Sequence, residues 1–139
     1  MSAKYFLDTN IFVYSFAPQQ TAKHKKAIQL IGQALEDGAG LISSQVAQEF
    51  LNVALHKFKK PLTWDEAHQY FEEVLSPLCG IYPDPGMYRK ALQIRHETGY
   101  HFYDALIVAA AMESGCKTLY SEDLQNNHKI SGLQIKNPF

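Results

Sequence analysis

Three aspartates of this 139-residue chain stand where carboxylates could act together on a cation. Asp8 and Asp123 each follow a short apolar run that predicts a strand, and Asp104 opens a long apolar run. Carboxylates held together repel one another, and a hard divalent cation relieves that repulsion. Oxygen-only ligands completed by water suit Mg²⁺, with Mn²⁺ as a substitute, rather than zinc. Such a site supports phosphodiester hydrolysis, because the metal activates water and neutralises the charge of the phosphate.

Asp104 is followed by eight consecutive apolar residues, 105–112. A helix without a polar face is buried on all sides. Burying an ionised aspartate is costly unless a cation or another group pairs with it. The simpler interpretation is that Asp104 charges the helix N-terminus, where the macrodipole favours an anion. Considered alone, Asp104 favours this simpler interpretation.

Asp8 has two interpretations of equal weight. It ends the apolar run 4–7, and ligands bind at the carboxyl ends of strands in open α/β sheets. It is also a favoured residue for the N-cap of the helix expected to begin near Thr9. Asp123 follows the strand expected at 117–120, so parallel strands would bring the two carboxylates to one edge of the sheet.

Other charged residues give weaker signals. Glu49 lies at the edge of the apolar arc of a helix expected over 44–58, and the pattern alone favours an ordinary surface glutamate. The basic runs 23–26 and 57–60 indicate solvated faces more strongly than phosphate contacts.

Short apolar strands alternate with helices, which predicts an α/β fold with a mainly parallel sheet. Strands are expected at 4–7, 41–43, 78–82, 117–120 and 133–135, with a polar loop at 125–129. Helices are expected at 11–16, 19–36, 44–58, 63–75, from the turn 83–86 to about 98, and at 103–115. Ile28 and Leu35 are expected on the buried face of the second helix, and Leu55 on the buried face of the third. Pro77 is expected to end the fourth of these helices.

Composition and missing motifs exclude several classes of function. The chain is 46% hydrophobic, which suits one domain over residues 1–139, and its net charge of −1 requires any nucleic-acid binding to come from a local patch or from bound metal. The six histidines show no metal-binding spacing, and there is no glycine-rich phosphate loop and no GxSxG elbow. Cys79 and Cys116 have no zinc spacing and are expected to be small buried residues in a reducing compartment. No signal peptide and no membrane span are expected, so the chain is predicted to be cytoplasmic.

Four segments together resemble the PIN-domain ribonucleases, in the same order and at compatible separations along essentially the whole chain. They are 5–14 (YFLDTNIFVY), 48–50 (QEF), 102–107 (FYDALI) and 120–124 (YSEDL). The chain's size and its lack of further domains are most similar to the VapC toxins of bacterial toxin–antitoxin pairs.

The resemblance implies a PIN-like three-layer sandwich that is a Mg²⁺-dependent endoribonuclease. It implies that Asp8 and Asp104 are the principal metal ligands and that Glu49 joins them directly or through water, which overturns the surface interpretation. Asp123 resembles the fourth acid and is preferred to Glu122 because the family shows Ser/Thr-x-Asp. The supporting polar residues are implied to be Thr9, Asn10 and Ser121.

The resemblance also implies a homodimer and a small antitoxin whose C-terminal segment blocks the acidic cleft. Residues 17–20 depart from the pattern, since they lack an acid that relatives often carry there. Three alternatives remain. The first is a PIN nuclease of RNA processing. The second is a non-catalytic PIN scaffold, and the intact acids argue against this scaffold. The third is a phosphohydrolase with Asp8 as nucleophile, a class that usually needs a second Asp where Asn10 stands.

Overall fold

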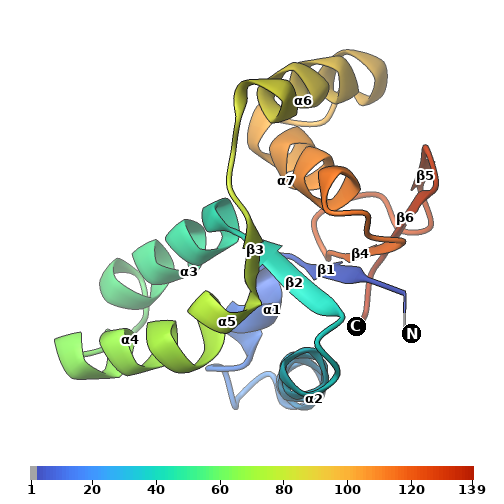
Figure 1. The fold of residues 1–139 in the computed structure, drawn as a ribbon. Coiled ribbons are helices and arrows are strands. Elements are labelled where there is room, and N and C mark those ends of the chain that lie inside the picture. The colour runs from blue at the N-terminus through green and yellow to red at the C-terminus, as the bar shows by residue number, and fades with distance from the viewer. Residues whose placement is uncertain (1–2) are drawn as a thin grey trace.

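A computed structural model describes residues 3–139 and shows an α/β fold built on a six-stranded sheet (Figure 1). The strands are β1 (Tyr5–Leu7), β2 (Gly40–Ser43), β3 (Cys79–Ile81), β4 (Thr118–Tyr120), β5 (Lys129–Ile130) and β6 (Leu133–Lys136). Their order in the sheet is β3-β2-β1-β4-β6-β5, and all neighbours are parallel except β5 and β6. The predicted fold class is therefore confirmed. The expectation of no signal peptide rests partly on Met1 and Ser2, which lie outside the described residues.

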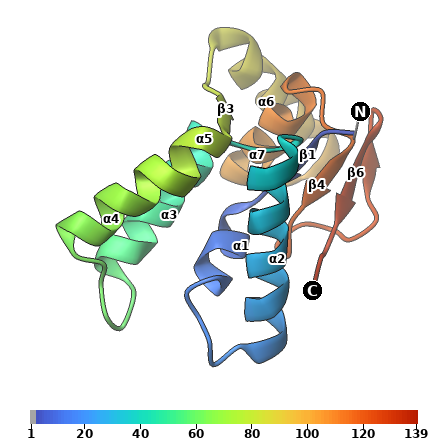
Figure 2. The ribbon, with the colours of Figure 1, turned by 60° about the horizontal axis from the view of Figure 1, so that its bottom comes forward.

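Helices cover both faces of the sheet. They are α1 (Thr9–Tyr14), α2 (Thr21–Asp37), α3 (Ser44–His56), α4 (Trp64–Tyr70), the π-helix η1 (Phe71–Leu75), α5 (Ser76–Leu78), α6 (Pro85–Thr98) and α7 (Phe102–Glu113). Figures 1 and 2 show α1 and α2 on one side of the sheet and α6 and α7 on the other. In the described part of the chain, no helix is both long enough and apolar enough to cross a membrane.

Helix α7 forms the centre of one layer. Residues 105–111 are all buried, as the uninterrupted apolar run predicts. Phe6 and Leu7 of β1 and Leu119 of β4 are also completely buried. This packing holds the carboxyl ends of β1 and β4 and the start of α7 in one rigid frame.

Two expected boundaries are wrong. The helix near 63–75 does not end at Pro77 but continues through η1 and α5 to Leu78. The turn before Pro77 has π-helical hydrogen bonding, and this local change in the hydrogen-bond pattern lets the helix pass a proline that cannot donate to a carbonyl of the preceding turn. The loop expected at 125–129 contains the start of β5, which pairs with β6 across a tight turn in which Ser131 and Gly132 both have positive φ.

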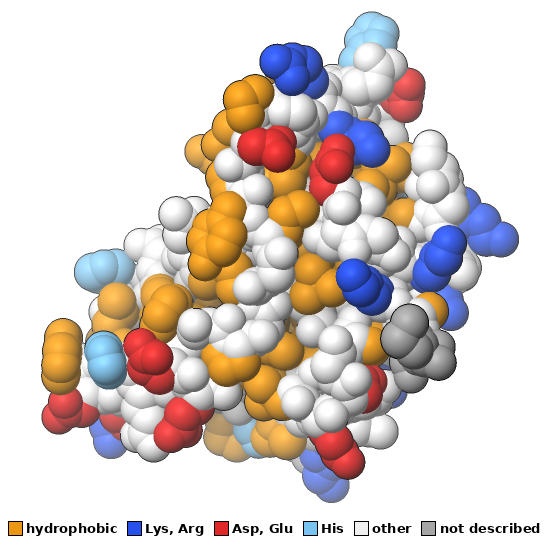
Figure 3. All heavy atoms as spheres, in the orientation of Figure 1, with side chains coloured by type: hydrophobic (Ala, Val, Ile, Leu, Met, Phe, Trp, Pro, Cys, Tyr) orange, Lys and Arg blue, Asp and Glu red, His pale blue; other side chains and the backbone are white. Residues whose placement is uncertain are grey.

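Some apolar side chains expected in the core are exposed instead. The exposed fractions of Ile28, Leu35 and Leu55 are 50%, 41% and 38%, and Cys79 is only half-buried, whereas Cys116 is buried. Hydrophobic side chains also gather over the middle of the face in Figure 3, while Lys and Arg gather at its edge near β5 and β6. A periodic pattern shows which side of a helix is apolar, but not how much of that side its neighbours cover.

Gly40, at the start of β2, has no room for a side chain. An added Cβ would lie 2.4 Å from the Ala34 Cβ and 2.7 Å from the Tyr5 ring. We expect Gly40→Ala to lower the free energy of unfolding by about 1–3 kcal/mol in urea denaturation, because both neighbours must shift. The control is Gly32→Ala, inside α2, where the added Cβ meets nothing within 4 Å. This substitution should raise the free energy of unfolding by roughly 0.5–1 kcal/mol, because alanine favours a helix more than glycine does. A Gly40→Ala protein as stable as the wild type would contradict this packing.

Candidate active site

The candidate site lies at the carboxyl edge of the three central parallel strands. Asp8 follows β1, and Ser121 follows β4 at the adjacent position, because Leu7 and Tyr120 are paired in the sheet. Helix α3 begins directly after β2 and carries Glu49 in its second turn. The first turn of α7 adds Asp104. The fold therefore brings to one edge acids that are up to 115 residues apart in the sequence.

Asp8 is a buried acid with both of its oxygens hydrogen-bonded. It is the N-cap of α1, where Oδ1 accepts a bond of 2.7 Å from the Thr9 backbone N–H. Its Oδ2 accepts a 2.7 Å bond from the Ser121 hydroxyl. Burial raises the pKa of Asp8 from 3.8 to about 6, opposed by these two hydrogen bonds and reinforced by the charges of Asp123 and Glu49. The cap interpretation is thus correct, and it leaves a carboxylate whose ionised form a cation would stabilise.

Asp123 is held in the loop that follows β4. The Asn10 side-chain amide donates to Asp123 Oδ2 at 2.9 Å, and the Asp123 backbone N–H donates to the Ser121 hydroxyl at 3.2 Å. Burial raises the pKa of Asp123, and the charges of Glu122 and Glu49 raise it further. Asn10, which stands where a phosphohydrolase would have its second aspartate, thus orients the Asp123 carboxylate instead.

Glu49 is half-buried and belongs to this network. Its Oε1 accepts a hydrogen bond from the Thr9 hydroxyl, and its Oε2 accepts one of 3.1 Å from the Gln45 side chain. The Gln45 amide also donates to the Tyr103 carbonyl at 3.1 Å, next to Asp104. Gln45 is absent from the residues that the sequence singles out. Its spacing of four residues from Glu49 on one helix was the available signal.

Among the four acids at this edge of the sheet, Asp104 has the fewest hydrogen-bond partners in the described chain. The N-cap of α7 is His101, and Asp104 lies in the first helical turn. Among residues 3–139, none of the groups that shift the pKa of Asp104 does so by a hydrogen bond to its carboxylate. Burial raises that pKa, as do the charges of Asp123 and Glu49, while His101 opposes the rise. Asp104 is therefore the carboxylate most available to an incoming cation.

Glu122, the other candidate for the fourth acid, is already engaged. Lys23 Nζ lies 2.8 Å from one of its oxygens, and the Tyr14 hydroxyl donates to the other at 2.6 Å. Burial alone would raise the pKa of Glu122, but the hydrogen bonds from Lys23 and Tyr14 lower it overall. Lys23 of the run 23–26 thus has a partner, although its side chain stays 39% exposed. This pairing favours Asp123 over Glu122 as a metal ligand.

The donor set fits a hard cation. Within residues 3–139, no three Asp, Glu, His or Cys side chains converge closely enough to hold a metal ion as they stand. Three of the acids are instead held by neighbouring polar side chains: Thr9 bonds Glu49, Asn10 bonds Asp123 and Ser121 bonds Asp8. The nearby acids provide only oxygen ligands, and one of them, Asp104, lacks a protein partner in the described chain. Oxygen donors of this kind suit Mg²⁺ or Mn²⁺.

Comparisons with known proteins agree with this architecture. The family described as PIN domain matches residues 5–129. No curated protein matches the chain in sequence. A toxin-antitoxin complex from Klebsiella pneumoniae is similar in structure, with a TM-score of 0.70 and 21% identity over 99% of this chain and 98% of that one.

Two further solved structures share the fold. DNA-bound VapBC from Salmonella typhimurium has a TM-score of 0.68 and 21% identity, over 97% of this chain and 98% of that one. VapBC2 from Rickettsia felis, bound to a DNA fragment from its promoter, has a TM-score of 0.64 and 21% identity, over 95% and 96% of the respective chains. Identities this low establish the shared fold alone.

Proposed function

Because the chain belongs to the PIN domain family, whose members are generally nucleases, we propose that it is a Mg²⁺-dependent endoribonuclease. We further propose that residues 1–139 form a single PIN domain that is the cytoplasmic toxin of a type II toxin–antitoxin pair. The observation that carries the nuclease proposal is the gathering of four acids at one edge of the sheet, where their charges raise one another's pKa values and the Ser121 hydroxyl bridges Asp8 and the backbone of Asp123. These acids are Asp8, Glu49, Asp104 and Asp123.

In this proposal Asp8 and Asp104 are the principal ligands, with Glu49 joining directly or through water and Asp123 as the fourth acid. When bound, Mg²⁺ or Mn²⁺ supplies a polarised water and neutralises phosphate charge. The protein's own contribution is orientation. Each Asp8 oxygen accepts one hydrogen bond, from Thr9 or Ser121, and so keeps a further lone pair for a cation. These supporting bonds fix the side-chain rotamers before substrate arrives.

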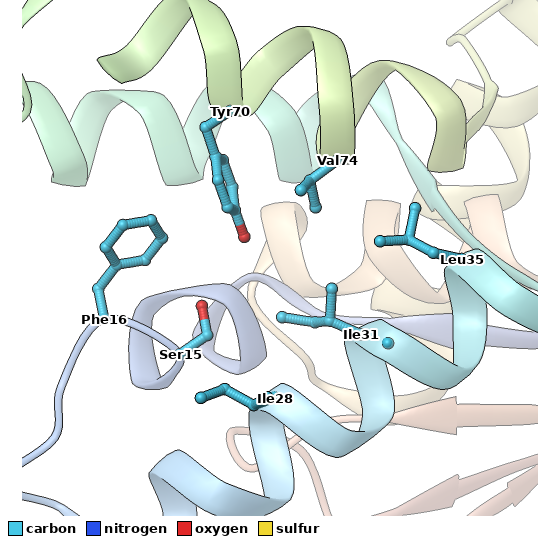
Figure 4. A pocket seen from close by; sticks show the side chains of 8 residues that line it. Ser15, Phe16, Ile28, Ile31, Leu35, Tyr70 and Val74 are labelled. Carbon is cyan, nitrogen blue, oxygen red and sulfur yellow. The ribbon is translucent and has the colours of Figure 1, made fainter.

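A surface that could receive an antitoxin segment is an apolar groove between helices. A groove of about 310 Å³ lies between α2 and the α4–η1 segment, and Figure 4 shows Ile28, Ile31 and Leu35 facing Tyr70 and Val74 across it. Its lining is mainly apolar, and a groove between helices suits the apolar face of a helical segment. The similar solved structures are toxin–antitoxin complexes, so we propose an antitoxin segment as the occupant.

The same groove lies near the acids. Phe16, at one end of the groove, follows the C-terminal end of α1, whose first residue is Thr9. The six residues of α1 span about 9 Å. An antitoxin segment that leaves the groove along α1 would therefore reach the acids, as the expected blocking of the site requires. The expected homodimer is part of the same proposal.

The test is cleavage of a mixed RNA substrate, with DNA in parallel, in Mg²⁺, in Mn²⁺ and in EDTA. We expect RNA to be cut with either metal and left intact in EDTA, with activity restored when metal is added in excess. Cutting in EDTA would contradict metal dependence, and equal cutting of DNA would contradict the assignment to RNA. Absence of cutting under all conditions would favour the non-catalytic scaffold. Growth that continues when an active nuclease is expressed would favour RNA processing over a toxin.

A further inference from the structure

Another cavity, separate from the groove of Figure 4, is lined by Tyr103, the residue before Asp104, and by Gln45, which is hydrogen-bonded to Glu49. It has a volume of about 280 Å³ and lies between the start of α3, the start of α7 and the connection from β3 to α6. We call it the Tyr103 pocket. The lining residues that matter here are Ser44, Gln45, Gln48, Tyr88, Phe102 and Tyr103.

The Tyr103 pocket and the acidic site share a wall. Gln45 lines the cavity, and its amide donates to Glu49 Oε2 and to the Tyr103 carbonyl, both at 3.1 Å, so one side chain contacts both the cavity and an acid of the site. Tyr103 also directly precedes Asp104 in the first turn of α7. A chain that places a phosphate at the acids would bring its neighbouring nucleotide over this cavity.

The lining of the pocket suits a base and not a phosphate. Tyr103 is 58% exposed and Tyr88 is 44% exposed, so large aromatic faces are available at its rim. His101 stacks on Tyr103 with ring centroids 6.1 Å apart and the planes inclined by 25°, which steadies the Tyr103 ring. Unpaired bases stack on such rings and bond to polar groups at their edges, here those of Ser44 and Gln48. None of the described residues that line the pocket is Lys or Arg.

We propose that the Tyr103 pocket binds an unstacked base of single-stranded RNA, adjacent to the phosphate that the acids act on. The proposal rests on the nuclease function and names its substrate class. A base inside a duplex is stacked and paired, so it must be freed before it can enter the pocket. The enzyme should therefore cut loops and single strands and leave stems intact.

The test combines pocket variants with an altered substrate. The probe is a single-stranded RNA oligonucleotide that the wild type cuts once, with abasic versions that lack the base on either side of the cut. We expect Tyr103→Leu to lower kcat/KM roughly tenfold, mainly through KM, because base stacking on an aromatic ring contributes about that much. Tyr103→Phe should retain wild-type activity. Tyr82→Leu is the control, since Tyr82 is 68% exposed but does not line the pocket.

The decisive result is coupling between protein and substrate. One abasic substitution should slow the wild type by the same factor as Tyr103→Leu and have little further effect on that variant. Independent, multiplying losses would overturn the proposal. So would a Tyr103→Leu protein whose only change is weaker self-association in sedimentation, because a second copy of the chain would then cover the pocket.

RNA binding can be measured separately from cleavage, so the pocket can be tested even if the nuclease assignment fails. Fluorescence anisotropy can follow binding of the same labelled RNA, and of an equivalent duplex, to the Asp104→Asn protein, which needs no turnover. Tighter binding of the single strand that is lost in Asp104→Asn/Tyr103→Leu would support the pocket even where nothing is cut. Equal binding of both RNAs by both proteins would overturn it.

Discussion

Asp104→Asn is expected to abolish metal-dependent RNA cleavage while the protein remains folded. Within residues 3–139, no hydrogen bond to the Asp104 carboxylate affects its pKa, so the loss of its charge removes the proposed cation ligand without breaking a structural contact. The rate should fall by more than roughly 100-fold, since even removal of a residue that only supports a metal ligand typically costs 10- to 100-fold. Cleavage assays and circular dichroism measure the two halves of this prediction.

A matched control lies on the same helix. Glu113 is at the opposite end of α7 from Asp104 and forms only a partly exposed ion pair of 3.7 Å with Lys90. Glu113→Gln should therefore cut RNA at the wild-type rate. Equal cutting by the wild type and Asp104→Asn would indicate a contaminating nuclease and would remove Asp104 from the site.

Asp8→Asn is expected to inactivate the enzyme and, at the same time, to stabilise the metal-free protein at neutral pH. Burial raises the pKa of Asp8 from 3.8 to about 6, so the folded protein binds this proton more tightly than the unfolded chain does. The stability that this proton contributes is complete below pH 4 and is lost as the pH rises through 6. At pH 7.5 in EDTA, removing the buried charge should raise the free energy of unfolding by up to about 3 kcal/mol.

The comparison between the two proteins isolates Asp8 from the other acids. Unfolding of the wild type and of Asp8→Asn should be followed by urea denaturation between pH 4 and pH 7.5, in EDTA and then in Mn²⁺. The stability advantage of Asp8→Asn should grow across this range, and Mn²⁺ should stabilise only the wild type. An Asp8→Asn protein less stable than the wild type at pH 7.5 in EDTA would show that the hydrogen bonds from Thr9 and Ser121 outweigh the cost of burial.

Much of this protein can be predicted from local patterns. Alternating strands and helices predicted the α/β class and the mainly parallel sheet, and the apolar run 105–112 predicted the buried helix α7. The short segments around Asp8, Glu49, Asp104 and Asp123 were sufficient to identify the family that the matched residues 5–129 confirm. Such patterns can be identified in the sequence because strand and helix periods, caps and apolar runs depend on residues that are close in sequence.

Only the tertiary structure decided which side chains meet. Lys23 engages Glu122 across 99 residues and so distinguishes it from Asp123, and Gln45 reaches the Tyr103 carbonyl across 58. The sequence also could not show how much of each apolar helix face other elements cover. Ile28, expected in the core, lies beside a groove and is half exposed. The physical reason is the same in each case. Local patterns give the order of the elements and the acids they carry, whereas partners and burial depend on how distant elements pack, which no local period encodes.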